Sequence, residues 1–487
     1  MPSIQNLMQI IEKQYSADDV QRIHQAYDFA DKAHAGQKRV SGCSYIEHPL
    51  GVAIILGSLK VDVATVMAGL LHDVPDDTAY NVASINKEFG ADVAMLVDGV
   101  GKLGKIKYRG IERYVENLRK MFVSIAADLR IALIKFADRI NNLETLDVLE
   151  TNKQYRIAME TLEIYAPLAG RLGINEFKEK LEDLSFKYIN PSEYAAAAEV
   201  INKERPAKEK ILDRAKTILK RELKNCSVIN IYGRAKNVYG FYQKMLRHNR
   251  DIDSIYDIIA LRIIVLNISD CYIALGLIHQ SWKPLRGRIK DYIAQPKPNG
   301  YRSLHTTIFG PDGNIIEIQI RTQEMDEEAK YGILAHWYYK DSQINKKKYF
   351  QKHFAWVDEI VKRQSDFPNK QEYIESLKID VFQDHIFVFT PTGDVIDLPK
   401  DATAIDFAYK IHSDLGNKCV SVIINNHIAS LDVKLRSYDV VKIITDKNRP
   451  GPNSHWLTFV KTKVAKDHIK LSITSKKNSN EIFAPMR

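Results

Sequence analysis

The chain has 487 residues, of which 45% are hydrophobic and 27% charged, which is typical of several folded domains rather than one. A net charge of +9 suits phosphate-rich partners such as nucleotides or RNA, although a merely soluble basic protein has the same property. The four cysteines lack paired spacing, which argues against a disulfide framework or a thiolate zinc site. With no apolar run near the ~20 residues of a membrane span and no export signal at the N-terminus, we expect a cytoplasmic protein without membrane contact.

The first part of the chain is predicted to be helical. Apolar residues recur at helical spacing from about residue 20 to 190, for example in 61–71 and 129–137. A charged, Ala-rich stretch then indicates further helix, interrupted at Pro206. We expect an all-α unit over 1–195, with a boundary near residue 195.

Residues 196–340 mix strand and helix patterns. Strands are predicted at 261–266 and 315–320, and helices at 237–247 and 271–282, separated by Gly/Pro turns. This stretch is predicted to form an α+β unit.

The last third of the chain divides into three stretches. Residues 341–379 are strongly charged and predict a helical linker. Residues 380–446 form a small strand-rich domain, with strands at 386–390 and 395–398. Residues 447–487 are expected to be a partial C-terminal segment.

A helix in the small domain is predicted to open at Thr403. Asp406 follows three residues later, which resembles a capping box, and Gly416 is the predicted C-terminal stop.

Four residues of the helical unit form a candidate metal site. One lies at a predicted helix start, two are adjacent where another helix ends, and one lies on a third helix: His48, His72, Asp73 and Asp138. Two imidazoles and two carboxylates suit Mn²⁺, Fe²⁺ or Zn²⁺ with positions left open for water, although a lone buried His is more often an ordinary core residue. Asn142 and Thr145 share the helical face of Asp138 and are candidates to hold a substrate.

The surrounding motifs resemble the HD phosphohydrolases, and more narrowly the hydrolase half of the RelA/SpoT family of alarmone enzymes. They lie at 72–78 and 135–142, with supporting stretches in the same order at 34–42, 45–49, 116–121 and 165–173. The resemblance implies an all-α HD hydrolase domain with Mn²⁺ held by the four candidate ligands. It also implies guanosine contacts from Arg39, Asn142 and Thr145, and removal of a 3′-pyrophosphate by metal-activated water.

Three positions depart from that family. Its catalytic Glu-Asp pair is Asp76-Asp77 here, its base-stacking Arg-Lys pair is Arg39-Val40, and the His before its Arg-Leu-Gly is Gly170. Asp76 keeps the charge that orients a water, but its carboxylate is one methylene shorter.

The α+β unit contains the groups that pyrophosphate transfer requires. Cations for polyphosphate are dense in three Gly-containing segments, at Arg234, Lys236, Arg288, Lys290, Lys297, Arg302 and His305. Asp257 stands immediately before an apolar strand, so a cation is the expected partner, and Mg²⁺ is the natural candidate. Alternation in 315–322 places Ile316, Ile318 and Ile320 on one face and Glu317, Gln319 and Arg321 on the other.

Each segment alone fits an ordinary half-buried strand, but together they resemble the RelA/SpoT synthetase domain in motif order. The resemblance implies a nucleotidyltransferase-like fold, Mg²⁺ on Asp257 with help from Glu317, and Glu317 activating the 3′ hydroxyl. It further implies ATP phosphate contacts from Arg234, Lys236 and Lys297, guanine stacking on Tyr301, and acceptor contacts from His305 and Gln319. The loop with Lys290 resembles that of bifunctional members, and Arg302 stands where Gln is usual.

The small domain resembles the TGS domain, a ubiquitin-like β-grasp module. The resemblance implies contact with tRNA, the ribosome or a regulatory protein, with His412 as the residue to test, and a passive spacer is the alternative. The segment from Trp456 is similar to the start of the family's later helical region, so the chain is expected to be a short member or a truncated one.

We therefore expect an enzyme that makes the alarmone (p)ppGpp from ATP and GDP or GTP, as GTP pyrophosphokinase, and that hydrolyses its 3′-pyrophosphate. Two alternatives remain at this point: a synthetase with a degenerate regulatory HD domain, and a non-catalytic tRNA or ribosome binder. Asp257 and Glu317 favour an enzyme, because carboxylates among the cations would repel RNA phosphates.

Overall fold

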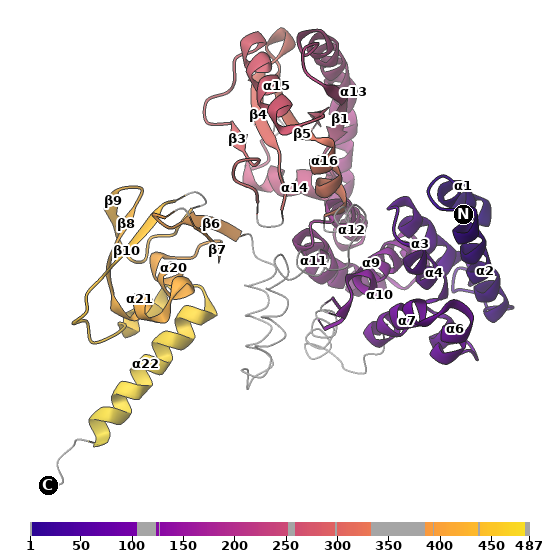
Figure 1. Ribbon diagram of the computed structural model, residues 1–487, viewed down its shortest axis with the longest axis horizontal. Coiled ribbons are helices and arrows are strands. Elements are labelled where there is room, and N and C mark those ends of the chain that lie inside the picture. The colour runs from indigo at the N-terminus through magenta and orange to yellow at the C-terminus, as the bar shows by residue number, and fades with distance from the viewer. Residues whose placement is uncertain are drawn as a thin grey trace. The chain divides into compact units, whose positions relative to one another are not determined.

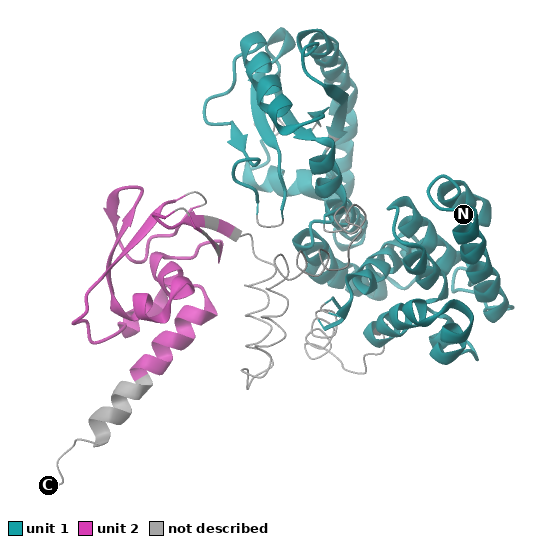
Figure 2. Ribbon diagram, in the orientation of Figure 1, with its two compact units in different colours: residues 1–363 teal, residues 364–487 magenta. Residues whose placement is uncertain are grey.

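The computed structural model describes residues 2–104, 123–125, 127–251, 259–297, 300–332, 385–392, 394–436 and 439–482. It forms two compact units, Met1–Arg363 and Gln364–Arg487, coloured separately in Figure 2. Asp257 and the predicted linker at 341–379 lie outside the described residues. Within the described part of the chain, no helix combines the length and the apolar character that a membrane span requires.

The N-terminal part of the first unit is helical, as predicted (Figure 1). Its helices are α1 (Ile4–Ile11), α2 (Ala17–Ala33), α3 (Glu47–Ser58), α4 (Val63–Leu71), α5 (Val74–Asp77), α6 (Val82–Phe89), α7 (Ala91–Gly104), α9 (Leu129–Glu144), α10 (Thr151–Glu160), α11 (Ala166–Arg171) and α12 (Asn175–Ile189). Asp62 and Asp128 start α4 and α9, because each side chain accepts a backbone N–H of the first turn. Helices α3, α4 and α9 pack on one another, so polar residues on their shared faces lie inside the unit.

Helix α13 (Pro191–Glu222) is continuous, so the predicted interruption at Pro206 is wrong. Pro206 lies on the exposed face, where the loss of one backbone hydrogen bond is offset by core packing on both sides. Ala197 and Ile201 are buried before it, and Leu212 is buried after it. The helix also runs through residue 195, where the boundary was expected.

A five-stranded mixed sheet follows, in the order β1-β2-β5-β4-β3. Strands β2 and β5 are parallel and the other neighbours are antiparallel. The elements are β1 (Val228–Ala235), α14 (Val238–Arg247), β2 (Ile259–Val265), α15 (Ile268–Ser281), β3 (Lys290–Asp291), β4 (Leu304–Phe309), β5 (Ile315–Thr322) and α16 (Gln323–Tyr331). The predicted α+β architecture is confirmed.

One face of this sheet is the core. Ile316, Ile318 and Ile320 of β5 are buried there, as the alternation predicted, in one core cluster with residues of α13 and α15. The opposite face carries Glu317 and Gln319, and this is the face on which the polar candidates gather.

The second unit is strand-rich, as predicted. Its elements are β6 (His385–Phe389), β7 (Val395–Pro399), α20 (Ala404–Ile411), α21 (Ser413–Lys418), β8 (Cys419–Ile424), β9 (His427–Ala429), β10 (Val441–Thr445) and α22 (Lys463–Ile482). β6 and β7 form a hairpin, and β8 lies between β10 and β9. Trp456, Val460 and Ala465 share a core with Ile405 of α20, so the segment after residue 446 packs on the small domain.

The start of α20 confirms the predicted capping box between Thr403 and Asp406. The predicted stop at Gly416 is wrong, because α20 ends at Ile411 and Gly416 lies inside α21. A Cβ at Gly416 would lie 2.3 Å from the Tyr409 ring, so glycine here permits close packing rather than ending the helix.

Candidate active sites

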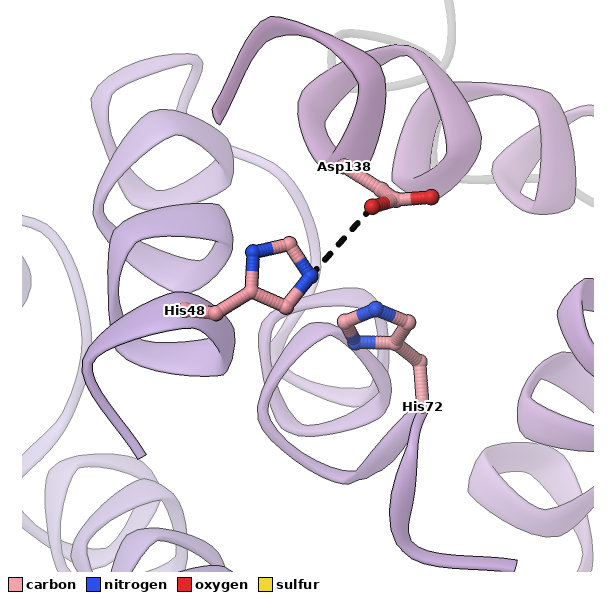
Figure 3. A group of neighbouring side chains, drawn as sticks. All are labelled: His48, His72 and Asp138. Atoms are coloured by element: carbon pink, nitrogen blue, oxygen red, sulfur yellow. Dashed lines mark ion pairs between the residues drawn. The ribbon is translucent and has the colours of Figure 1, made fainter. Parts of the chain in front are cut away.

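Three helices of the first unit bring polar side chains together in its interior. His48 lies in the first turn of α3, His72 ends α4, and Asp138 lies in the middle of α9. Figure 3 shows the three side chains pointing toward one another from separate helices. All three are buried, and their ligand atoms lie within 4.8 Å of one another. The helix positions predicted for these residues are confirmed.

Asp73 completes the group of four predicted ligands. His48 Nε2 lies 3.3 Å from Asp138 Oδ1 and 3.5 Å from Asp73 Oδ2, and His72 Nε2 lies 3.2 Å from Asp73 Oδ1. Donors bound to one cation at ~2.1 Å stand about 3.0–3.4 Å apart in octahedral or tetrahedral geometry. The ligand atoms of His48, His72 and Asp138 therefore lie close enough together to share a divalent cation, and Asp73 lies beside both imidazoles.

Both imidazoles present Nε2 to this group. His48 Nδ1 lies 2.7 Å from Asn141 Oδ1, and His72 Nδ1 lies 2.8 Å from the Gly69 carbonyl oxygen, so each Nδ1–H is the donor. His72 Nε2 is buried and makes no hydrogen bond with the described residues. A buried imidazole nitrogen that makes no hydrogen bond and lies beside two carboxylates is expected of a metal ligand, because its lone pair is kept for the cation.

Lys135 holds the other oxygen of Asp138. Its Nζ lies 2.6 Å from Asp138 Oδ2, so Oδ1 remains directed at His48. Burial raises the pKa of Asp138, but Lys135 and His48 outweigh it and hold that pKa well below its usual range. The carboxylate is therefore ionised, as a metal ligand must be.

The predicted guanosine-binding residues lie beside the cluster. Arg39 Nη2 donates to Asn142 Oδ1 at 2.8 Å and Arg39 Nη1 to Thr145 Oγ1 at 3.4 Å. Asn142 in turn donates to Asp138, which joins the group to the proposed metal ligand. Val40, in the place of the family's Lys, is 78% exposed.

The two candidate catalytic carboxylates of the hydrolase differ in their surroundings. Asp76 and Asp77 lie on α5, one turn after His72. Asp77 accepts a hydrogen bond from Tyr45, whose hydroxyl also donates to Asp73 Oδ2 at 3.1 Å. Burial, together with Asp73 and Asp77, raises the Tyr45 pKa, so this phenol stays protonated and tethers α5 to the cluster. Asp76 lies near Gly101 of α7.

The second site is a polar row across the sheet of the α+β unit. The register places five residues directly opposite one another, one on each strand: Tyr232, Arg262, Gln319, His305 and Lys290. Three of these were predicted site residues from separate segments. Strand pairing alone brings them onto one face.

Glu317 is the carboxylate at the centre of this face. Its Oε1 accepts from Gln319 Nε2 at 3.0 Å and lies 3.3 Å from His305 Nδ1. Burial raises the pKa of Glu317, but His305, Gln319 and Lys244 outweigh it and lower that pKa to about 2. Among the described residues, its Oε2 accepts no hydrogen bond, and that oxygen is left for a cation or a hydroxyl.

The tautomer of His305 follows from its two partners. Burial lowers its pKa, so the ring is neutral at physiological pH. With Nδ1–H directed at Glu317, Nε2 accepts from the Tyr301 hydroxyl at 2.8 Å. The Lys297 ammonium lies 5.1 Å from the centre of the Tyr301 ring and 4.7 Å from that of Tyr292.

Lys297 has an electrostatic environment suited to an anion. Burial, together with Lys290 and Lys178, lowers its pKa. Crowded cations of this kind favour a bound phosphate, because its negative charge relieves their mutual repulsion.

The remaining predicted phosphate contacts have other neighbours as well. Burial lowers the pKa of Arg262 in the polar row, and Arg234 lies close enough to lower it further. Arg234 on β1 is ion-paired with Glu179 of α12, and Lys236 lies near Gly240 of α14. Arg302 donates to Glu328 of α16 at 2.8 Å.

Several residues with direct contacts to the candidate sites were missed from the sequence. In the helical site, the candidate residues are hydrogen-bonded by Asn141, Lys135 and Tyr45. In the sheet site, Arg262 donates to Gln319 Oε1 at 3.1 Å. Lys135 and Asn141 lie three residues before and three residues after Asp138, and this helical spacing could have predicted that they lie beside it. Tyr45 and Arg262 act across elements distant in sequence, for which a single sequence has no signal.

Three regions of the chain match known families. Residues 26–175 match the HD domain, residues 233–344 match the region found in RelA/SpoT proteins, and residues 386–445 match the TGS domain. The fold and these matches define a multidomain protein with an HD domain, a RelA/SpoT synthetase-type domain and a TGS domain.

Relatives match across most of the chain. A protein of Myxococcus xanthus named GTP pyrophosphokinase is 46% identical over 94% of this chain and 61% of its own length. The bifunctional (p)ppGpp synthase/hydrolase SpoT of Escherichia coli strain K12 is 41% identical over 98% of this chain and 68% of its own length. The chain belongs to the RelA/SpoT family.

The similarity does not extend over the whole of these relatives. The chain spans about three fifths of the length of the curated proteins it matches at 44–46% identity. Among solved structures, the small alarmone synthetase 1 of Bacillus subtilis is 22% identical with a TM-score of 0.25, over 35% of this chain and 94% of its own.

Proposed function

We propose that the chain transfers pyrophosphate from ATP to the 3′ hydroxyl of GDP or GTP at the sheet site, and removes the 3′-pyrophosphate of (p)ppGpp at the helical site. The names of its relatives, GTP pyrophosphokinase and bifunctional (p)ppGpp synthase/hydrolase, support both halves of this proposal. The gathering of predicted residues around Glu317 is the observation that carries it.

For synthesis, Glu317 is the group that meets the acceptor hydroxyl. With a pKa of about 2 it is ionised at all physiological pH values, so it would accept a hydrogen bond from the 3′ hydroxyl, and with Asp257 it would hold Mg²⁺, which would neutralise phosphate charge. A carboxylate of such low pKa has little driving force to store a proton. Its role is therefore to orient the hydroxyl and bind a cation, while Lys297 and Lys290 neutralise phosphate charge.

For hydrolysis, the four ligands would hold Mn²⁺, which supplies Lewis acidity that activates water and neutralises phosphate charge. Arg39, Asn142 and Thr145, which contact one another, would bind the guanosine next to it, and Asp76 and Asp77 of α5 are proposed to orient water. The donor set fits a divalent ion of this class, because it mixes imidazole with carboxylate.

The TGS domain is proposed to contact tRNA, the ribosome or a regulatory protein. His412 caps α21, with its Nδ1 accepting the backbone N–H of Asp414 at 3.2 Å. The four free thiols fit the cytoplasmic setting that is part of this proposal.

Both activities are tested by thin-layer separation of labelled nucleotides. The parent chain with ATP, GDP or GTP and Mg²⁺ should form the alarmone, and Asp257→Ala or Glu317→Ala should abolish the product. Continued synthesis by both variants would remove the assignment of the sheet site.

Hydrolysis is tested with labelled (p)ppGpp and Mn²⁺, comparing the parent with His72→Ala. Release of pyrophosphate by the parent alone supports the helical site. Synthesis without hydrolysis would instead identify a regulatory HD domain, in keeping with Asp76 and the exposed Val40. Salt-sensitive tRNA binding with no turnover under either condition would favour an RNA-binding protein.

A further inference from the structure

The imidazole of His48 is held from behind by a side chain of another helix. Asn141 lies on α9 three residues after Asp138, and it is 6% exposed. Its Oδ1 lies 2.7 Å from His48 Nδ1, across the interface between α3 and α9. The contact is buried, so water is not an alternative partner for the ring nitrogen.

Close packing restrains the amide of Asn141 as well. Gly51 lies on α3, one turn after His48, and a Cβ at that position would lie 2.2 Å from Asn141 Nδ2. Real Cβ atoms do not approach so closely, so the absence of a side chain at Gly51 is what admits the amide. The backbone of α3 at Gly51 therefore restrains the Asn141 amide, whose oxygen accepts from His48 on the same helix.

The hydrogen bond between His48 Nδ1 and Asn141 Oδ1 determines which ring nitrogen of His48 can bind a cation. With its Nδ1 proton donated to Asn141 Oδ1, the neutral ring has its lone pair on Nε2, which faces Asp138 and Asp73. The other tautomer would place a proton on Nε2, where a cation must bind. His72 has the same arrangement with the Gly69 carbonyl, which no side-chain substitution removes.

We propose that Asn141 is a positioning residue for the divalent cation, accepting the Nδ1 proton of His48 and thereby holding its Nε2 lone pair on the ion. The inference rests on the proposed metal site and adds to it a residue that does not itself bind the ion. Groups in this position act through ligand orientation and basicity, so their loss appears first in metal affinity.

The test is Mn²⁺ affinity, measured by the electron paramagnetic resonance signal of free Mn²⁺ during titration of the parent chain, Asn141→Leu and Asn141→Asp. Leu keeps the branched shape of Asn and removes the acceptor, so binding should weaken about 10- to 100-fold. Asp keeps an oxygen at the same place, so its affinity should stay within a few-fold of the parent. Thr65→Val is the matched control, because Thr65 is a buried polar residue of α4 whose hydroxyl donates to Asp62 at 2.6 Å and not to a proposed ligand.

Thermal unfolding of each variant in EDTA reports folding without the ion. Should Asn141→Leu fail to fold, Asn141→Ala removes the acceptor without adding volume and takes its place. Parent-like Mn²⁺ affinity in the folded Leu or Ala variant overturns the role of Asn141, as does a loss in Asn141→Asp equal to that in Leu. No Mn²⁺ binding by the parent would overturn the metal site itself, which is a distinct result.

Discussion

The guanidinium of Arg234 on β1 is ion-paired with the carboxylate of Glu179 on α12. Beside it, Asp183 of the same helix accepts the backbone N–H groups of Val238 at 3.1 Å and Tyr239 at 2.8 Å, at the start of α14. A guanidinium and the N-terminus of a helix are groups that bind phosphate. Carboxylates of α12 therefore occupy the N-terminus of α14 and Arg234, to which the family resemblance gives a contact with ATP phosphate.

Replacing Glu179 should improve ATP binding. Glu179→Gln removes the charge that competes for Arg234, and because the pair is partly exposed the gain is modest, roughly two- to fivefold in KM for ATP. The measurement is initial-rate synthesis at varied ATP with GDP saturating. Glu193→Gln is the control, since Glu193 pairs with Arg250 at 2.7 Å away from these donors. An unchanged or higher KM in Glu179→Gln would contradict the competition.

The sequence predicts the helices that carry the metal ligands, because apolar spacing is strong around 61–71 and 129–137. The sequence does not predict which guanidinium and backbone N–H groups already have a carboxylate partner. The contact between Glu179 and Arg234 joins residues 55 positions apart, and α12 packs on α14, which follows β1. Pro206 and Gly416 were misjudged for a related reason: local propensity is weak beside the tertiary packing at those positions.

Two substitutions of Tyr301 should distinguish a role of its ring in binding GDP from a role of its hydroxyl in catalysis. Tyr301→Phe keeps the ring near Lys297 but removes the hydrogen bond to His305, which is worth about 0.5–1.5 kcal/mol, or roughly a two- to tenfold loss of kcat. KM for GDP should stay near the parent value.

Tyr301→Ala removes the ring as well and should raise KM for GDP. The two variants are compared by steady-state synthesis at varied GDP. If Phe and Ala change KM equally, the ring is not a binding surface for the acceptor.

Glu317 should make stability depend on acidic pH. Its pKa is lowered from 4.5 to about 2 in the folded chain, so its contribution of about 3 kcal/mol is fully present above pH ~4.5 and is lost as the pH falls toward 2. Glu317→Gln lacks this contribution. The difference in unfolding free energy between parent and variant should therefore shrink from pH 5 to pH 3, as followed by urea unfolding. A difference that stays constant over this range would show that the carboxylate is not stabilised by its neighbours.

Asp326 should be essential for stability rather than chemistry. Arg321 is fully buried and pairs with Asp326, which also accepts from Tyr232 at 2.9 Å and Lys330 at 2.8 Å. Asp326→Asn leaves a buried guanidinium without its counter-ion, at a cost of about 3–5 kcal/mol. Urea unfolding measures it, with Asp312→Asn as control because the Arg214–Asp312 pair is exposed and its loss should change little. Equal stability of both variants would contradict the role of the buried pair.

The order of the residues in the polar row across the sheet cannot be predicted from the sequence alone. Alternation in β5 predicts that Glu317 and Gln319 share a face, and the structure confirms this. That His305 of β4 and Arg262 of β2 lie directly beside Gln319 depends on strand order and register. Register is set by pairings between distant segments, so a single sequence shows the residue types of the row but not their order.

Asp76 is the position at which hydrolysis should be limited. The family has Glu there, and Asp76 is exposed on α5, with its Oδ2 3.4 Å from where a Cβ on Gly101 would stand. Asp76→Glu restores the length of the family's side chain and moves the carboxylate by about one methylene. Since misplacement of a catalytic group by ~1 Å can cost ~100-fold, hydrolysis of (p)ppGpp with Mn²⁺ should rise by up to that factor.

The matched variant is Asp77→Glu, which makes the same extension in a carboxylate already bound by Tyr45. It should not increase the rate, because lengthening Asp77 disturbs a tether that also reaches Asp73. Both are assayed as pyrophosphate release at saturating (p)ppGpp. A parent that hydrolyses well and gains nothing from Asp76→Glu would show that the shorter carboxylate already reaches its water. The difference from the family would then have to be sought at Val40, where an exposed apolar side chain replaces a cation.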